Sequence, residues 1–102
     1  MKLFYENTPL SDECLKAFII WYKQQYRNTH IYNSCYWDDL PFEMQYTVYI
    51  DFFLSNDMEV DIKGSKKEGY WTKINNKVYK NPMPLHLARV EAVREGSETY
   101  NK

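Results

Sequence analysis

The stretch WDDLPFEMQYTVYIDFFL, residues 37–54, decides the fold that we expect for this chain. Asp38 and Asp39 can accept backbone N–H bonds at a helix start, and Pro41 is tolerated in a first turn because its missing N–H would have no partner there. At about 100° per residue, the apolar side chains that follow fall on one broad face: Phe42, Tyr46, Tyr49, Ile50 and Phe53. We therefore expect a helix that starts near Leu40.

The same stretch has a second interpretation. The β-branched and aromatic run TVYIDFF, residues 47–53, is also typical of a buried strand, because short apolar runs are ambiguous by period alone. We favour the helix, since the apolar spacing fits a period of about 3.6 residues and a cap precedes it. In a helix, Glu43, Thr47 and Asp51 would form a polar strip beside the apolar face.

This central run and the closing segment ARVEAVREGSETYN, residues 88–101, resemble a group of short, largely uncharacterised proteins of tailed bacteriophages. Those proteins carry a similar Leu-Pro-Phe-Glu-Met-Gln and Val-Tyr-x-Asp-Phe-Phe core, followed by a few strands and a C-terminal helix. The likeness covers about a third of the chain, and Tyr46 and Thr47 stand where the group has Trp-Gly. The resemblance implies a phage origin and this layout, and it brings no catalytic residues.

Composition bounds the size and class of the protein. A chain of 102 residues is one domain with a single modest core. Aromatic residues make up 18% and Gly only three positions, so we expect a core of rings, and rings with polar groups also suit interfaces. Two cysteines are too few for a disulfide scaffold, and no apolar leader or membrane-spanning run is present. We expect a reduced, cytoplasmic protein.

Local signals place the other helices and strands. Ser11 as an N-cap and an acidic first turn predict a helix from Asp12 to residue 27 or 28. Asn56 and Asp57 end the central helix. Alternation predicts a strand over residues 58–63, and residues 70–74 and 77–80 form a hairpin around Asn75-Asn76.

The end of the chain completes an α+β domain. Pro82 and Pro84 should end the sheet, and Pro84 should open a final helix. Gly96 should stop or fray this helix and leave residues 96–102 as a mobile tail. The expected order is α-α-β-β-β-α over residues 1–102, in two layers, with helices on one face of a small antiparallel three-stranded sheet.

The inventory for catalysis is thin. His30 and Cys35 could form a base and nucleophile, but such a pair is defined by geometry that spacing cannot supply. A zinc site could be assembled from Cys14, His30, Cys35 and His86, yet no Cys-x-x-Cys or His-x-x-x-His spacing supports it. We expect a protein that is not an enzyme and that uses no metal or cofactor.

Acidic residues are concentrated in the centre of the chain. Residues 38–61 hold seven Asp or Glu and no Lys or Arg. Such a surface could imitate a row of phosphates and compete for a basic groove, although an acidic strip is also typical of a solvated helix face. The expected function is binding and inhibition of a host protein or anti-phage defence complex in the bacterial cytoplasm. The expected contacts are Trp37, Asp38, Asp39, Glu43, Tyr46, Asp51, Glu59 and Asp61.

A basic block follows. Residues 63–80 hold six lysines and one acid, interleaved with Tyr70, Trp71 and Tyr79. Lysines contact phosphates and rings stack bases, although lysines also guard strand edges against aggregation. The alternative function is therefore a nucleic-acid-binding accessory protein that uses Lys63, Lys66, Lys67, Trp71, Lys73 and Lys77. The exposure of Trp71 tests this alternative, because a buried ring could not stack on a base. A homodimer through exposed Tyr and strand edges is a further expectation.

Overall fold

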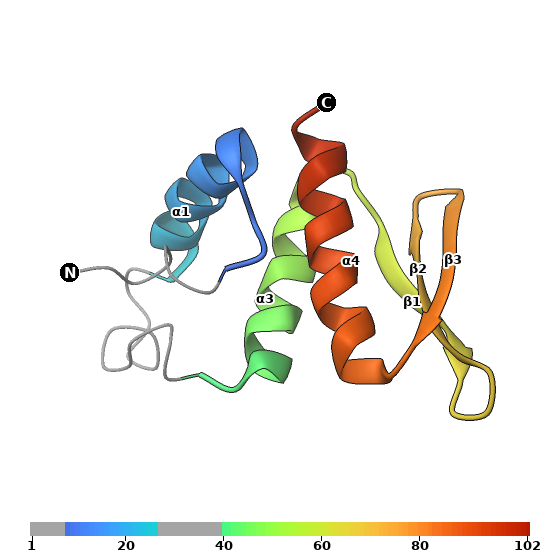
Figure 1. Ribbon diagram of the computed structural model, residues 1–102. Coiled ribbons are helices and arrows are strands. Elements are labelled where there is room, and N and C mark those ends of the chain that lie inside the picture. The colour runs from blue at the N-terminus through green and yellow to red at the C-terminus, as the bar shows by residue number, and fades with distance from the viewer. Residues whose placement is uncertain (1–7, 27–39) are drawn as a thin grey trace.

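The computed structural model describes residues 8–26 and 40–102 (Figure 1). Its elements are α1 (Asp12–Tyr26), α3 (Phe42–Ser55), β1 (Val60–Ser65), β2 (Gly69–Ile74), β3 (Lys77–Met83) and α4 (Leu85–Tyr100). The strands form one antiparallel sheet in the order β1-β2-β3. The predicted α+β class and the order of helices and strands are confirmed.

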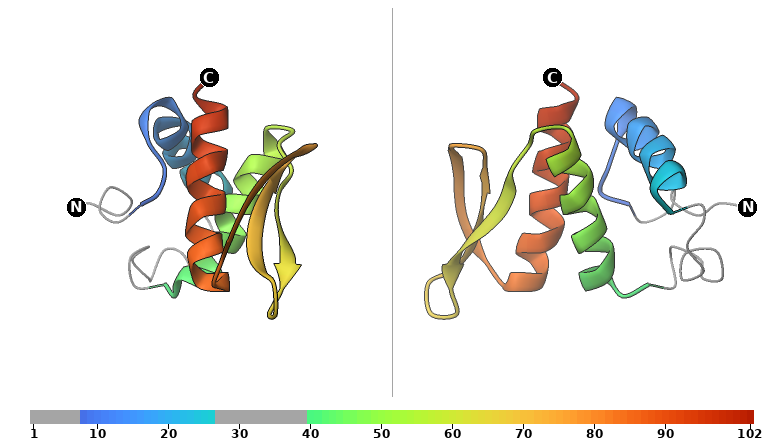
Figure 2. Two further views of the ribbon diagram at one scale, coloured as in Figure 1. Left: turned by 45° about the vertical axis from the view of Figure 1, so that its right-hand side comes forward. Right: turned by 180° about the vertical axis from the view of Figure 1, so that it is seen from behind.

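The helices lie on one side of the sheet. α4 packs mainly on β2 and β1, and α3 lies beside α4 and contacts β1 (Figure 1 and Figure 2). α1 packs on α3 and α4, on the side away from the sheet. The helices therefore form two tiers, and the inner tier covers the sheet. Within residues 8–26 and 40–102, no helix or strand covers the opposite face of the sheet.

Aromatic rings fill the space between α1 and α3. The buried ring of Phe18 has its centroid 5.0 Å from that of Tyr49 and 5.4 Å from that of Phe52. Trp21 makes a further edge contact with Phe52, at 5.5 Å between centroids. Edge-to-face pairs such as Phe18–Phe52 contribute about 0.5–1.5 kcal/mol each beyond the burial of their area. The core is built from rings, as the composition predicts.

The start of α3 differs from the prediction. Pro41 is the N-cap, with φ −57° and ψ 148°, and it makes no side-chain capping hydrogen bond. Its carbonyl instead accepts hydrogen bonds from the N–H groups of Met44 and Gln45. Placing Pro41 inside the first turn was wrong, because its extended ψ keeps it outside the helix. The predicted caps, Asp38 and Asp39, lie outside the described residues.

The end of α3 agrees with the prediction. Asp57 has a φ of 60°, in the left-handed region. Its N–H donates to the carbonyl of Leu54, and the N–H of Met58 donates to the carbonyl of Phe53 at 2.9 Å. These two bonds form a Schellman motif, which satisfies carbonyls at the helix end. The helix accordingly stops at Ser55, as Asn56 and Asp57 predict.

The hairpin of β2 and β3 turns at Asn75 and Asn76, as predicted. Asn75 has a φ of 53°, its N–H donates to the carbonyl of Glu59 at 2.8 Å, and its side-chain oxygen accepts from the N–H of Glu59 at 2.9 Å. Pro82 does not end the sheet, because it lies within β3. β3 is an edge strand, where a residue without an N–H is tolerated.

α4 does not stop at Gly96. The helix continues to Tyr100, and Gly96 and Ser97, which were expected in a tail, are buried. A Cβ at Gly96 would lie 2.8 Å from Cζ of Phe53. Glycine here allows α4 to approach α3 closely, and the predicted helix end was wrong because the sequence alone does not distinguish these two uses of glycine.

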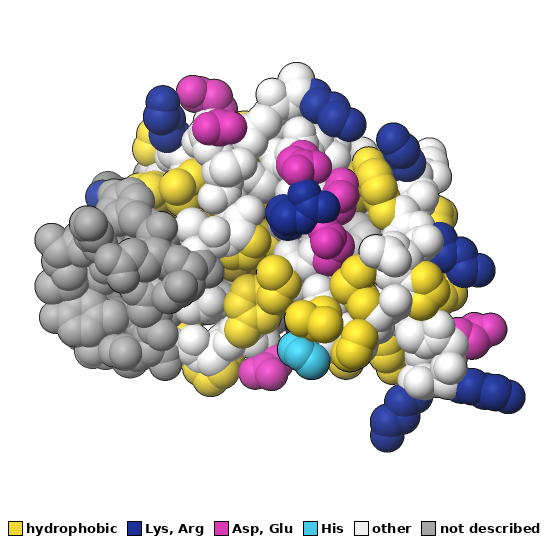
Figure 3. All heavy atoms as spheres, viewed as in Figure 1, with side chains coloured by type: hydrophobic (Ala, Val, Ile, Leu, Met, Phe, Trp, Pro, Cys, Tyr) yellow, Lys and Arg dark blue, Asp and Glu magenta, His cyan; other side chains and the backbone are white. Residues whose placement is uncertain are grey.

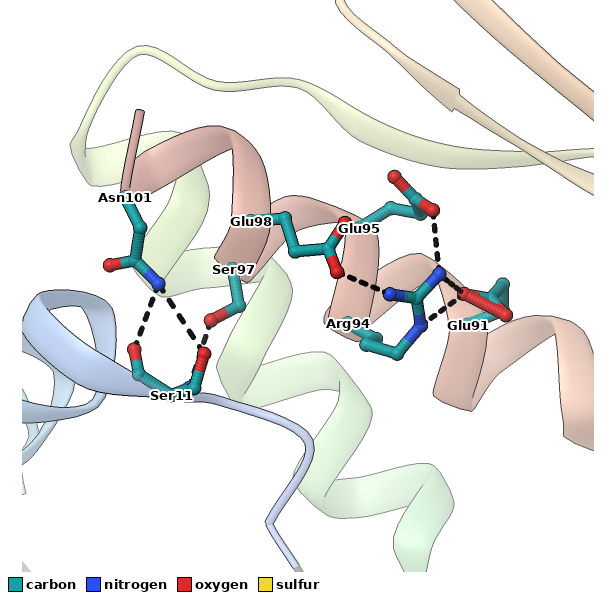
Figure 4. Close-up of polar contacts among 7 residues, drawn as sticks. All are labelled: Ser11, Glu91, Arg94, Glu95, Ser97, Glu98 and Asn101. Atoms are coloured by element: carbon teal, nitrogen blue, oxygen red, sulfur yellow. Dashed lines mark hydrogen bonds and ion pairs between the residues drawn. The ribbon is translucent and has the colours of Figure 1, made fainter.

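The first turn of α1 is joined to the last turns of α4 (Figure 4). The backbone N–H of Ser11 donates to Oγ of Ser97 at 3.0 Å. The N–H of Cys14 donates to Oδ1 of Asn101 at 2.8 Å. Nδ2 of Asn101 donates to the carbonyl of Ser11 at 3.0 Å. The predicted start of α1 at Asp12 is confirmed. The backbone N–H groups there find side-chain acceptors in Ser97 of α4 and in Asn101, the C-cap of α4.

Candidate binding surface

The sheet face that points away from α4 is uncovered by the described helices (Figure 2). Val60 pairs with Ile74 and Ile62 pairs with Thr72, and Val60, Thr72 and Ile74 are buried on the α4 side. Because side chains alternate along a strand, the residues between them belong to the opposite face. We call this set the open face: Asp61, Lys63, Trp71, Lys73 and Val78, together with Lys80, whose ammonium lies over the Trp71 ring.

Trp71 lies on the central strand with a lysine of each strand near it. Lys63 of β1 is its direct partner in the register, and Lys73 follows two residues later in β2. The ammonium of Lys80, from β3, lies 4.8 Å from the centroid of the Trp71 ring. This separation is typical of a cation–π contact. Trp71 is only partly buried, so an aromatic surface is accessible among three positive charges.

The open face also carries one carboxylate. Asp61 lies 3.1 Å from Nζ of Lys63 and pairs with Lys73 in the register. Desolvation opposes its ionisation, but hydrogen bonds from Lys63 and the Ile62 N–H and the charges of Lys63 and Lys73 hold its pKa below the ordinary value. Three lysines against one ionised aspartate leave the open face with a net positive charge.

The predicted nucleic-acid contacts divide between three places. Lys63, Trp71 and Lys73 are on the open face. Lys66 and Lys67 are exposed in the turn between β1 and β2, where basic side chains project from the end of the hairpin (Figure 3). Lys77 pairs with Ile74 and so belongs to the face that α4 covers.

Lys77 and Lys80 make parallel contacts on opposite faces of β3. The ammonium of Lys77 lies 5.1 Å from the centroid of the Tyr79 ring, whose residue pairs with the buried Thr72. Lys80 instead covers Trp71 on the open face. The sequence-based contact set included Lys77 and omitted Lys80. Because these two lysines are an odd number of residues apart, the sequence indicates that they point to opposite faces of the strand. Which of the two faces is covered depends on where α4 packs, and the sequence pattern does not show this.

Part of the predicted acidic contact set is brought together. Glu43 of α3 lies 4.0 Å from Nη1 of Arg89 in α4. Burial raises the pKa of the nearby Tyr46 to about 12; the charge of Asp61 raises it further and that of Arg89 lowers it. Glu43 and Tyr46, one turn apart on α3, therefore lie near Arg89 of α4, whereas Asp61 belongs to the open face and reaches Tyr46 only through its charge.

The rest of that set is not gathered in the same way. Asp51 and Glu59 are exposed, and Trp37, Asp38 and Asp39 lie outside the described residues. The polar strip of α3, which consists of Glu43, Thr47 and Asp51, is exposed as expected. Met44 and Leu54 on the same helix are also exposed, at 46% and 50%. α3 thus presents both acidic and apolar groups to solvent.

Three acids of α4, of which Glu98 is exposed and the other two are half-buried, surround one arginine. Arg94 donates from Nη1 to Glu98 at 2.5 Å, from Nη2 to Glu95 at 2.7 Å, and from Nε to Glu91 (Figure 4). Opposite charges at i, i+3 and i, i+4 are neighbours on a helix surface. These carboxylates are occupied within the helix, so this cluster is less suited than the α3 strip to imitate a row of phosphates.

Groups for catalysis are sparse among the described residues. Cys14 is buried, and desolvation raises the pKa of its thiol to about 11, although a hydrogen bond with Ser97 opposes the shift. A thiol of this kind is a poor nucleophile at neutral pH. Residues 8–26 and 40–102 contain no group of three His, Cys, Asp or Glu side chains that could hold a metal ion. His30 and Cys35, which the sequence offers as a conceivable base and nucleophile but which we did not expect to act as a pair, lie outside the described residues.

None of the helices in the described ranges is long and apolar enough to cross a membrane. Comparisons of the chain with protein-family models, with curated proteins and with solved structures gave no match. Fold class alone does not specify an activity, because one fold hosts many functions. The side chains on the open face and on α3 are what can specify a ligand.

Proposed function

We propose that this protein binds nucleic acid through the open face of its sheet and catalyses no reaction. The observation that supports this function is the partial exposure of Trp71 among lysines from all three strands. Lysines neutralise phosphates and release counterions, and an exposed ring offers bases a stacking surface. The sequence alone favoured the acidic surface; the position of Trp71 reverses that preference.

Protection of strand edges does not account for all three lysines. Lys63 and Lys80 lie on the edge strands β1 and β3, where lysines discourage association with another sheet. Lys73 lies on the central strand, which has no edge to protect. Its place on the face of Trp71 therefore favours a ligand that carries negative charge.

The test removes the three charges of the open face from the full chain. The variant carries Lys63→Gln, Lys73→Gln and Lys80→Gln, and the matched control carries Lys16→Gln, Lys23→Gln and Lys102→Gln at exposed positions elsewhere. The affinity for a labelled single-stranded oligonucleotide of mixed sequence is measured by fluorescence anisotropy over a salt series. Three lost phosphate contacts to a single strand lower the salt slope by about 2. An equal loss in the control variant would overturn this surface.

A second function is supported by the exposed acidic residues of α3, Glu43 and Asp51, and by the half-buried Tyr46 one turn after Glu43. In this alternative, a phage-encoded protein inhibits a host or anti-phage defence protein in the bacterial cytoplasm by covering its basic surface with the α3 strip. The exposed Met44 and Leu54 add the apolar contact that an interface needs. Electrostatic complementarity would then steer the partner to α3.

Charge reversal tests this alternative. The variant carries Glu43→Lys and Asp51→Lys, and the matched control carries Glu13→Lys and Glu68→Lys at exposed acids elsewhere. Partners are captured from host lysate at low and high salt, with and without nuclease, and identified by mass spectrometry. A basic partner that is retained after nuclease and lost only with the α3 variant supports inhibition. A partner that the α3 variant still captures excludes this surface.

A further inference from the structure

We infer that the open face takes single-stranded nucleic acid and that an unpaired base replaces the ammonium of Lys80 on the Trp71 ring. This inference rests on the proposed function and specifies its ligand. In the structure the ammonium lies 4.8 Å from the ring centroid, so a side chain of the protein itself occupies a stacking position. A base that stacks on this side of the ring displaces Lys80.

The exchange is favourable for both groups. A cation–π contact at an exposed site is weaker than a base–aromatic stack. Lys80 is exposed, and its flexible stem lets the displaced ammonium follow the incoming backbone to a phosphate. Lys80 thus shields the ring in the unbound protein and contributes a phosphate contact in the complex.

The shape of the open face favours a single strand over a duplex. The major groove of a duplex admits a helix or a two-stranded ribbon, and its bases are stacked on one another. The open face is a three-stranded sheet, and its accessible ring is on the central strand. A duplex would meet the lysines alone, whereas an unpaired base reaches Trp71 while its phosphates contact Lys63 and Lys73. This geometry uses every group that the face brings together.

The decisive experiment compares Lys80→Gln with Lys77→Gln in the full chain. Both lysines belong to β3 and cover a ring, at 4.8 Å and 5.1 Å, but they do so on opposite faces. Each variant and Trp71→Ala is titrated over a salt series with a single strand of about 12 nucleotides, within the site sizes typical of such surfaces. The same sequence in a duplex, and polyglutamate, serve as competing ligands.

We expect the single strand to bind more tightly than the duplex. Trp71→Ala should weaken binding of the single strand by about 5-fold to 150-fold and leave its salt slope unchanged, because stacking releases no counterions. Lys80→Gln should lower the salt slope by about 0.7, whereas Lys77→Gln should match the parent. In NMR spectra, ring-current shifts of the Lys80 methylene protons should disappear when the single strand binds, and those of Lys77 should persist.

The contrary results separate the two claims. Equal binding of both forms, with Trp71→Ala at parental affinity, would overturn the single-strand inference and leave a nucleic-acid surface made by lysines. No binding of either form would overturn the proposed function itself. Polyglutamate that binds as tightly as the single strand would assign the face to an acidic protein segment. Should Trp71→Ala fail to fold, Trp71→Leu provides the same comparison with an apolar side chain that cannot stack, and parental affinity in that variant would overturn stacking on the ring.

Discussion

Oδ1 of Asn101 accepts a 2.8 Å hydrogen bond from the backbone N–H of Cys14, which lies 87 residues earlier in the chain. An N–H in the first turn of a helix has no partner within that helix. Asn101 satisfies it from the end of α4 and donates in return to the carbonyl of Ser11. The C-terminal turn of the protein is therefore part of the start of α1.

Replacing Asn101 should loosen this junction. We expect Asn101→Ala to lower the free energy of unfolding by about 1–2 kcal/mol, because it removes a capping acceptor and a donor together. Asn101→Asp keeps the acceptor for Cys14 and loses the donor to Ser11, so its loss should be intermediate. Urea denaturation measures both, with Asn81→Ala, an exposed change on β3, as the control. Equal stabilities of Asn101→Ala and this control would show that the junction contributes nothing.

The buried thiol beside this junction predicts a loss of stability at alkaline pH. Burial raises the pKa of Cys14 to about 11, whereas the thiol of the unfolded chain ionises near its ordinary value of 9.0. As the pH rises, the unfolded state releases its proton first, so the free energy of unfolding falls between about pH 9 and 11. Cys14→Ala should be less stable at pH 7 but should lose less stability over this interval. Parallel pH profiles from urea denaturation would contradict the assignment.

Signals within a few residues of the chain predicted the helix and strand ends that depend on local backbone chemistry. The start of α1 at Asp12, the end of α3 at Asn56 and Asp57, and the turn at Asn75 and Asn76 all follow from capping or left-handed propensity. Gly96 carries the same local signal as a helix stop, yet it lies inside α4. Its role depends on Phe53, a residue 43 positions earlier, and local sequence does not report that contact.

The candidate site shows the same division. The sequence placed Trp71 and Lys73 together in one predicted strand, and in the structure they lie two residues apart on the same face of β2. Whether that face is covered depends on where α4 packs, and the choice of Lys77 over Lys80 was therefore beyond the sequence pattern. For the acidic set, spacing along α3 placed Glu43 and Asp51 on one strip, but the proximity of Arg89 arises only from helix packing.

Gly96→Ala should reverse the usual effect of this substitution. Alanine within a helix ordinarily gains about 1 kcal/mol over glycine. Here the new Cβ would lie 2.8 Å from the ring of Phe53, so overpacking should cost about 1–3 kcal/mol. Thermal and urea unfolding measure the sign. Phe53→Leu should remove part of the clash, so the double variant should lose less than the sum of the single losses, and a stabilised Gly96→Ala would refute the close approach.

Asp57 offers a site where glycine should stabilise. Its φ of 60° is in the left-handed region, which an L-residue occupies at a cost and glycine does not. We expect Asp57→Gly to raise the free energy of unfolding by about 0.5–1 kcal/mol. Asp51→Gly is the matched control, since the same change in the exposed interior of α3 should lower stability, by roughly 0.3 kcal/mol. Changes of the same sign at both positions would contradict the Schellman geometry.

Trp71 and Phe52 should separate a binding ring from a structural ring. Phe52 is 1% exposed and contacts Phe18, Trp21, Phe53 and Tyr100, so Phe52→Ala should cost about 3–5 kcal/mol. Trp71 is partly exposed on the open face, and a cation–π contact at such a site is worth about 0.5–1 kcal/mol. Trp71→Ala should therefore cost less than half as much as Phe52→Ala in urea denaturation. A Trp71→Ala variant as unstable as Phe52→Ala would identify the Trp71 ring as part of the core. The variant would then not be folded well enough for the binding experiments to report on stacking.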